Sequence, residues 1–220
     1  MFAQQIATFA LVINQQYYII ENGEQAGPFS LDELQEHHLT LDTQVSSSLN
    51  SSWQPASDLP ELTSYFYAQG IYIVSEDNLA GFWWRLLAYI FDNFIISYLL
   101  ITIIQVGNLP INIQATTSGS TEDLLKFDLL AIALTIVYNV LLEATPLRGS
   151  LGKYILRLAV IDAQGQKESL GRALVRNLGK LISSLALGIG FIAIFWSPYS
   201  QAWHDEMAKT YVIRKPLNKR

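Results

Sequence analysis

The chain has 220 residues, half of them hydrophobic, with no cysteine and a formal net charge of −5. The absence of cysteine excludes a disulfide framework and a thiolate metal site, and the length accommodates one or two domains. All 14 Lys and Arg residues lie from Arg85 onward, whereas the segment before it carries only acidic charge. An acidic first part disfavours nucleic acid, and a basic second part favours contact with lipid headgroups.

The segment after the N-terminus predicts a small folded module. Tyr17 begins a short β-rich run that ends in a turn signal. Ser30 follows a chain-breaking Gly-Pro-Phe, and Glu33 stands three residues later, which is the capping-box pattern of a short helix. With further short strands ending near Trp53, the pattern predicts an α+β module over residues 15–62.

The order of aromatic, Gly-Pro-Phe and Trp elements in this module resembles a GYF-type domain of the second variety. The matching elements are Tyr17-Tyr18, Gly27-Pro28-Phe29-Ser30, Glu33-Leu34, Asp42-Thr43 and Trp53-Gln54-Pro55-Ala56. The chain departs from the parent family in lacking a Gly-Tyr-Phe tail and in having a serine-rich loop at 45–52.

The GYF resemblance implies an aromatic groove for proline-rich peptides. The residues that it marks for peptide binding are Tyr17, Tyr18, Gly27, Pro28, Phe29 and Trp53. The alternative is that Tyr18, Phe29 and Trp53 form the core of the module.

Two apolar segments are long enough to cross a bilayer, which takes about 20 residues. The first runs over about 82–105 and contains Arg85 and Asp92. The second runs from Leu124 to about Ala144. An ionisable residue at membrane depth usually faces the protein interior or marks function. The sequence therefore predicts an integral membrane protein with buried polar contacts.

A third apolar segment, 181–197, is short for a span and contains two glycines. An amphipathic basic helix over 170–180 precedes it. The segments 157–162 and 210–214 are strand-like and are able to pair on one side of the membrane. The third segment therefore either crosses the membrane or forms a re-entrant or interfacial hairpin.

The distribution of basic residues indicates the orientation. Seven basic residues lie in 145–180, and none lies in 106–123. By the positive-inside rule the first loop is cytoplasmic and the second is outside, which makes the N-terminal module cytoplasmic as well. Five more basic residues follow 197, so we expect a cytoplasmic tail. The expected location is a bacterial-type cytoplasmic (inner) membrane.

Polar residues in the two spans predict contacts between them. Arg85 and Asp92 share a helix face about 10 Å apart along the axis. A polar stripe on the second span consists of Asp128, Thr135, Asn139 and Glu143. For antiparallel spans this arrangement predicts an Arg85–Glu143 pair and a contact of Asp92 with Asn139 or with a basic residue.

The second half of the chain resembles the RDD family of membrane proteins, which is named for one arginine and two aspartates. The matching elements are Gly81-Phe82-Trp83-Trp84-Arg85, Asp92, Glu143-Ala144-Thr145-Pro146, Ser150-Leu151-Gly152-Lys153, Val160-Ile161-Asp162, Leu170-Gly171-Arg172-Ala173, Arg176-Asn177, Ser197-Pro198 and His204-Asp205. The naming residues correspond to Arg85, Asp92 and Asp205. Asp205 is expected to pair with Arg85 or with the basic loop. The resemblance also implies cation/proton exchange, since some family members are linked to it.

Two functions remain open at this point. The first is a non-enzymatic membrane protein, with the cytoplasmic module binding a protein partner and the membrane domain serving anchoring or assembly. The second is a small cation/proton exchanger working through Asp92 in a homo-oligomer, with Asp128 and Glu143 as further candidates. Structural use of the polar residues, through interhelical hydrogen bonds of about 1 kcal/mol each, supports the first.

We expect no enzyme, cofactor or metal site. His204 precedes Asp205, but the other histidines, His37 and His38, belong to the separate module. The predicted fold class is a small α+β GYF-like domain followed by an α-helical membrane domain, with two firm spans and a third spanning or re-entrant segment. The expected division is an extension (1–14), the GYF-like domain (15–62), an aromatic connector (63–80) at headgroup level or adding a strand, the membrane domain (81–214) and a basic tail (215–220).

Overall fold

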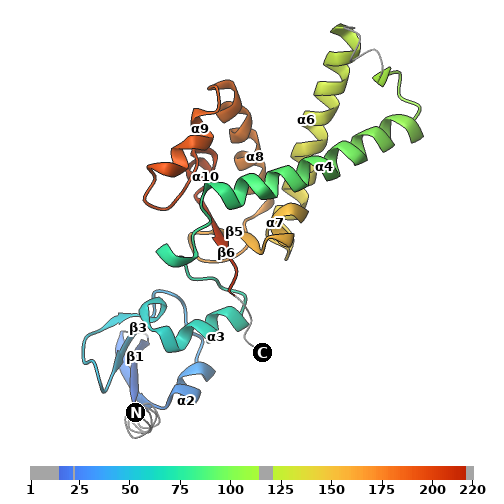
Figure 1. Ribbon diagram of the computed structural model, residues 1–220. Coiled ribbons are helices and arrows are strands. Elements are labelled where there is room, and N and C mark those ends of the chain that lie inside the picture. The colour runs from blue at the N-terminus through green and yellow to red at the C-terminus, as the bar shows by residue number, and fades with distance from the viewer. Residues whose placement is uncertain (1–14, 22, 114–120, 217–220) are drawn as a thin grey trace, which may run out of the picture. The chain divides into compact units, whose positions relative to one another are not determined.

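The computed structural model describes residues 15–21, 23–113 and 121–216, which form two compact units (Figure 1). Unit 1 comprises residues 1–73 and unit 2 comprises residues 74–220. The expected N-terminal extension, and the basic tail beyond residue 216, lie outside the described residues.

Unit 1 contains a four-stranded antiparallel sheet with the strand order β2-β1-β3-β4. The strands are β1 (Tyr17–Glu21), β2 (Glu24–Phe29), β3 (Gln44–Ser47) and β4 (Gln54–Pro55). Side chains alternate between the faces of a strand, and Tyr17 and Ile19 of β1 are buried. The expected α+β module is confirmed.

The helices of unit 1 cover the inner face of this sheet. Helix α2 (Leu31–Glu36) begins at Ser30, whose hydroxyl accepts from Glu33 N at 3.3 Å, while the Glu33 carboxylate accepts from Ser30 N at 2.8 Å. The predicted capping box is confirmed. Two short 3-10 turns follow, η1 (Ala56–Asp58) and η2 (Pro60–Leu62).

Helix α3 (Thr63–Ala68) differs from the expectation for the connector. Tyr65 and Phe66 are buried in the core of unit 1. The start of the connector is therefore neither a strand nor a segment at headgroup level, since it is a helix whose buried rings remove apolar surface from water within unit 1.

Unit 2 contains two helices that are long and apolar enough to cross a membrane. They are α4 (Phe82–Val106) and α6 (Thr121–Glu143), joined through residues that include the undescribed 114–120. The inner face of α4 repeats every four residues, with Ala88, Asp92, Ile96, Leu100 and Ile104 buried. Both predicted spans are confirmed, and their outer surfaces are rich in exposed apolar side chains.

A small two-stranded sheet lies at the ends of these helices. Strand β5 (Leu158–Asp162) pairs antiparallel with β6 (Thr210–Arg214), as the sequence predicted. Ala80, just before α4, donates its N–H to Val212 O at 2.8 Å. The start of α4 and the C-terminal strand therefore lie together.

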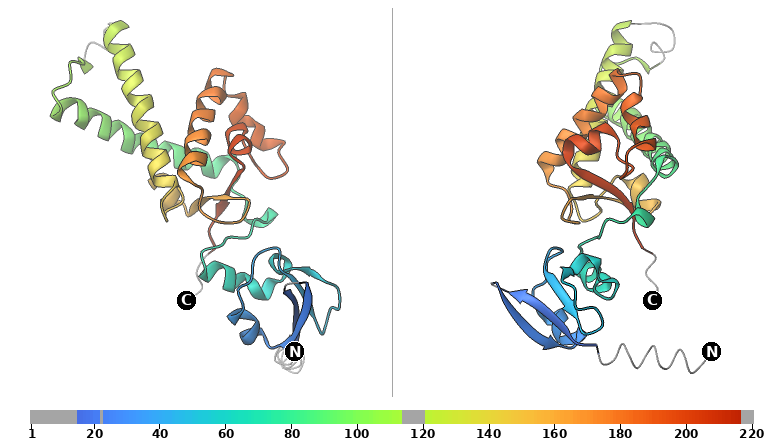
Figure 2. Two further views of the ribbon diagram at one scale, coloured as in Figure 1. Left: turned by 180° about the vertical axis from the view of Figure 1, so that it is seen from behind. Right: turned by 90° about the vertical axis from the view of Figure 1, so that its left-hand side faces the viewer.

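The remaining helices of unit 2 lie next to this sheet or extend from it (Figure 2). Helix α7 (Leu151–Ile155) follows α6, and α10 (Trp203–Ala208) precedes β6. Between them, α8 (Leu170–Leu185) turns back through α9 (Ile189–Ile192) and η4 (Ala193–Phe195). The bend between these two parts is 114°, which confirms the prediction of a third, spanning or re-entrant, segment.

Candidate functional site: a buried charge cluster in unit 2

Arg85 lies one turn into α4, and its guanidinium turns back toward the start of the helix. It donates from Nε to Ala80 O at 2.8 Å and from Nη2 to Ser200 O at 2.5 Å, and it forms an ion pair with Asp205. Side chains on a helix lean toward its N-terminus, which explains the direction. The expected pairing of Arg85 with Asp205 is confirmed.

Asp205 is fully buried and links three elements. One carboxylate oxygen accepts from Arg176 Nε at 2.8 Å, and the other accepts from Arg85 and from Ala202 N at 3.2 Å. Burial alone raises the pKa of a carboxyl group, but Arg85 and Arg176 hold the pKa of Asp205 well below its usual range. Asp205 is therefore an ionised bridge between α4, α8 and α10.

Glu143, the last residue of α6, is also fully buried. It pairs with Lys153 of α7 and accepts from Arg176 Nη1 at 2.8 Å and from Asn177 Nδ2 at 2.7 Å. The predicted Arg85–Glu143 pair is wrong. Cations from α7 and α8 pair with Glu143 instead. The prediction considered only the two spans, so it did not include the positions of α7 and α8.

Arg176 joins the two carboxylates, since it contacts both Asp205 and Glu143 and is 1% exposed. We call the set of Arg85, Glu143, Lys153, Arg176 and Asp205 the charge cluster. The sequence predicted a basic amphipathic helix over 170–180, and the basic second part of the chain was assigned to contact with lipid headgroups. The overlap of this helix with the matched Arg176-Asn177 element was the available signal for a buried role.

Asp92 lies two turns further into α4, where it caps α7. Its carboxylate accepts from Ser150 Oγ at 2.5 Å, from Gly152 N at 2.8 Å and from Tyr138 OH at 2.9 Å. A Cβ added at Gly152 would meet Ala88 O and would lie 2.9 Å from Asp92 Cγ. The close approach of α4 and α7 therefore requires glycine here.

The predicted contact of Asp92 with Asn139 or with a basic residue is also wrong. Asn139 donates to Thr135 O of its own helix at 2.9 Å, and Asp92 is held instead by Tyr138, the neighbour of Asn139 on α6, and by the Ser150–Gly152 turn. Asp128 is exposed on α6, and within the described residues it forms no ion pair with the charge cluster. The structure thus brings Arg85, Glu143 and Asp205 into one cluster and places Asp92 beside it.

Glu168 is a buried carboxylate that the sequence did not single out. It is 1% exposed, and its two oxygens have no hydrogen-bond partner within the described part of the chain. Arg176 Nη1 lies 3.8 Å away. Burial raises the pKa of Glu168 to about 7, against the opposing effect of Arg176.

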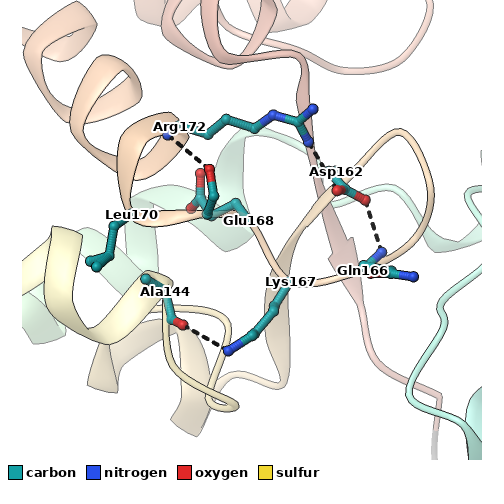
Figure 3. A pocket seen from close by; sticks show the side chains of 8 residues that line it. Ala144, Asp162, Gln166, Lys167, Glu168, Leu170 and Arg172 are labelled. Carbon is teal, nitrogen blue, oxygen red and sulfur yellow. Dashed lines mark hydrogen bonds and ion pairs between the residues drawn. The ribbon is translucent and has the colours of Figure 1, made fainter.

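Glu168 also contributes to the wall of an open pocket of about 570 Å³. Figure 3 shows Glu168 close to the N-terminus of α8, with Asp162, Lys167 and Arg172 also lining the pocket. Arg172 pairs with Asp162 at 2.9 Å, and Lys167 Nζ lies 3.5 Å from Ala144 O. The charged groups at this opening therefore already have protein partners.

His204 does not form a metal site in the described residues. No group of three His, Asp or Glu side chains suited to a metal occurs there. The His204 Nε2 atom lies 3.4 Å from Asp205, and its ring packs against Phe191. Burial lowers the pKa of His204 to about 3, so it is a neutral residue of the interior.

The six residues marked for peptide binding in unit 1 separate into two groups. Tyr17 is 2% exposed and donates from its hydroxyl to Glu61 at 3.1 Å, and Phe29 packs partly buried against the core. Burial and the Glu61 carboxylate raise the pKa of Tyr17. Tyr17 and Phe29 are therefore core residues.

The other four, Tyr18, Gly27, Pro28 and Trp53, form what we call the outer patch. Gly27 has φ +127°, and a Cβ there would lie 3.0 Å from Tyr18 Cδ1, so the tyrosine ring lies over it. Tyr18 is opposite Ser46 in the sheet, and the β3–β4 register, continued by one residue, brings Trp53 to the other side of Ser46. Trp53 is 39% exposed.

Two family models match the chain in the predicted order. The model described as GYF domain 2 matches residues 17–62, and the model described as RDD family matches residues 79–209. The uncharacterized protein YxaI of Bacillus subtilis (strain 168) is 35% identical over 149 residues, which cover 62% of this chain and 97% of that protein. No solved structure gives a significant match to the chain.

Proposed function

We propose that this chain, which belongs to the RDD family, is a non-enzymatic membrane protein that recruits a protein partner through its GYF-like module. In this proposal unit 2 serves for anchoring and assembly in a bacterial-type cytoplasmic membrane, with unit 1 in the cytoplasm. Lipid surrounds the apolar spans of unit 2, and neither matched family is an enzyme family.

The observation that carries the structural role of unit 2 is the saturation of its buried carboxylates. Three donors hold Asp92, and two guanidinium groups and a backbone N–H hold Asp205. A carboxylate that exchanges ions must lose its protein donors or share them with the ion. The dense bonding of these groups therefore favours a fixed tie between helices over a transport site.

The recruitment role rests on the outer patch. An exposed tryptophan and an exposed proline, together with a half-buried tyrosine on the face of the sheet opposite the core, suit a polyproline II ligand, which docks on aromatic surfaces. The acidic charge of residues 1–84 further favours a ligand with basic flanks.

A binding measurement with the full chain in lipid nanodiscs tests recruitment. A fluorescent oligoproline peptide with flanking lysines is titrated against the wild type, Trp53→Ala and, as control, the exposed His38→Ala. We expect binding that weakens at least tenfold in Trp53→Ala and is unchanged in His38→Ala. Equal binding by the three proteins would contradict the proposal.

The alternative function is a small cation/proton exchanger working through Asp92 in a homo-oligomer. The position of Asp92 within a span favours it. Collapse of a pH gradient on addition of Na⁺, K⁺ or Li⁺ to proteoliposomes distinguishes the two, with wild type beside Asp92→Asn and, as control, Asp32→Asn at an exposed carboxylate of unit 1. We expect no cation-dependent proton movement; movement that is lost only in Asp92→Asn would establish the exchanger.

A further inference from the structure

The segment from α8 to η4 begins and ends beside the same sheet of unit 2, and therefore at the same depth relative to the membrane. Strand β5 comes before the segment and β6 comes after it, and the two strands pair along their whole length, from Leu158↔Arg214 to Asp162↔Thr210. A chain that crossed the membrane once between two paired strands would have to carry one strand through the bilayer. Residues 163–209 therefore cross the bilayer an even number of times or not at all.

The first leg of the segment, helix α8, is held at the end of α6. Arg176 and Asn177 of α8 bond to Glu143, the last residue of that span. From Asn177 to the turn at Leu187 is ten residues, or about 15 Å at 1.5 Å per residue. This is about half of a hydrocarbon core of roughly 30 Å, so the tip of the segment ends inside the membrane.

The second leg, formed by α9 and η4, returns to the start of α4. The ring of Phe195 lies 5.0 Å from that of Phe82, the first residue of α4, and Phe191 packs on His204. Gly190 packs closely on Ser183, because a Cβ at Gly190 would lie 2.7 Å from Ser183 Cβ. The two legs therefore form a closed hairpin whose base is level with the charge cluster.

The tip of this hairpin is apolar and uncovered. Leu185, Leu187 and Ile189 are 85%, 92% and 48% exposed within the chain. Leu187 and Gly188 make the turn with positive φ values of 52° and 81°. Figures 1 and 2 show α8 and α9 extending from the β5–β6 sheet in the same general direction as α6. The tip thus points in the general direction of α6 and away from the sheet.

We infer that residues 170–195 form a re-entrant hairpin whose Leu185–Ile189 tip is covered by the acyl chains of the leaflet on the sheet side. The occupant is lipid because the tip continues the apolar surface of two spanning helices and lies at mid-bilayer depth. Unit 2 then crosses the membrane twice, and β5, α10 and β6 are on the same side as the start of α4.

The absence of cysteine from the chain makes this inference directly testable. Single-cysteine variants of the full chain are made at the exposed positions Val106, Gln164, Leu187 and Glu206. Sealed vesicles of both orientations are treated with a membrane-impermeant maleimide, then with a lipid-soluble one. Total labelling in detergent is the control for folded, accessible protein.

We expect Gln164→Cys and Glu206→Cys to react from one side and Val106→Cys from the other. Leu187→Cys is expected to react only with the lipid-soluble reagent. Labelling of Glu206→Cys from the same side as Val106→Cys would overturn the inference. So would aqueous labelling of Leu187→Cys from either side.

A second copy of the chain is the rival occupant of the tip. An oxidant-dependent disulfide dimer of Leu187→Cys, which persists when the protein is diluted into excess lipid, would assign the tip to a homo-oligomer and overturn the inference. If Leu187→Cys does not fold, Leu185→Cys replaces it, since Leu185 lies on the same tip and within α8.

Discussion

The interior of unit 1 and the interior of unit 2 are filled by different kinds of side chain. In unit 1, ten apolar residues form a continuous core, which includes Ile19, Leu34, Leu62 and Phe66. Unit 2 has a smaller apolar cluster, which includes Leu158 and Val212. Among its described residues, however, the largest fully buried side chain is Arg176, which lies between the buried carboxylates Glu143 and Asp205. Buried ion pairs are thus added to apolar packing in unit 2, whereas the core cluster of unit 1 is apolar.

The difference follows from the solvent that each unit excludes. In water, burial of apolar surface is worth about 25 cal/mol per Å², so an aliphatic core suffices for unit 1. Lipid chains are as apolar as leucine, so apolar packing between spans gains little, and polar contacts decide which helices associate. A charge buried there must be paired, since an uncompensated ion is far more costly than a lost methyl group.

Removal of Arg176 gives the largest expected effect. In Arg176→Met, Glu143 and Asp205 each lose one cation, and we expect a loss of about 3–5 kcal/mol in the free energy of unfolding. The apparent melting temperature in mild detergent, followed by tryptophan fluorescence, measures this. Lys126→Met, which breaks an exposed pair with Glu122, is the control. Similar melting of the two variants would refute the role of the charge cluster.

The second-largest expected effect is that of a cavity in the apolar core of unit 1. Leu62 is 0% exposed, so Leu62→Ala is expected to cost about 3 kcal/mol. Because no Lys or Arg precedes Arg85, trypsin reports only on unit 2, whereas chymotrypsin also cuts unit 1. We expect faster chymotryptic cleavage within unit 1 and unchanged tryptic cleavage of unit 2. A change in both would show that the units do not unfold independently.

The same contrast explains what the sequence predicted well. Periodicity and cap signals found the elements: the capping box at Ser30, both spans, the pairing of 157–162 with 210–214 and the interrupted third segment are all present. These signals are local or are set by apolar patterning.

The ion-pair and hydrogen-bond partners of the buried side chains in unit 2 were predicted poorly, because they depend on helices that are distant in the sequence. Arg85 was expected at Glu143, but Arg176, 33 residues beyond Glu143, occupies that carboxylate. Asp92 was expected at Asn139, but the Ser150–Gly152 turn holds it. One arginine differs little from another in a sequence, and only the packing of α7 and α8 decides which carboxylate each one reaches.

A pH dependence tests whether every charge near the cluster is compensated. The pKa of Glu168 is raised from 4.5 to about 7 by burial; the groups that face it are Arg176, Lys180, Glu143 and Lys153. A raised carboxyl pKa makes the ionised form costly in the folded state. Stability from this group is therefore greatest below pH 4.5 and is lost as the pH rises to about 7, by at most about 1.4 kcal/mol per pH unit.

Comparison of Glu168→Gln with wild type isolates this effect. His204 acts in the opposite direction, because its pKa is lowered to about 3 and its stabilising contribution is lost as the pH falls below 6.5. The His204 contribution is common to both proteins and cancels in the difference between them. We expect Glu168→Gln to melt higher than wild type at pH 8 and no higher at pH 4.5. A constant difference across this range would contradict an ionisable, uncompensated Glu168.

The smallest expected effect concerns a charge pair of the same chemistry outside the cluster. Arg172 bonds to Asp162 at 2.9 Å, but its side chain is 41% exposed, against 2% for Arg176 one turn later. Solvent screens such a pair, which is worth about 0–1 kcal/mol. Arg172→Met should therefore change the melting temperature in detergent only slightly, and still less in high salt. A loss of stability as large as that of Arg176→Met would mean that the Arg172–Asp162 pair at the N-terminus of α8 contributes as much as the charge cluster to holding the helices of unit 2 together.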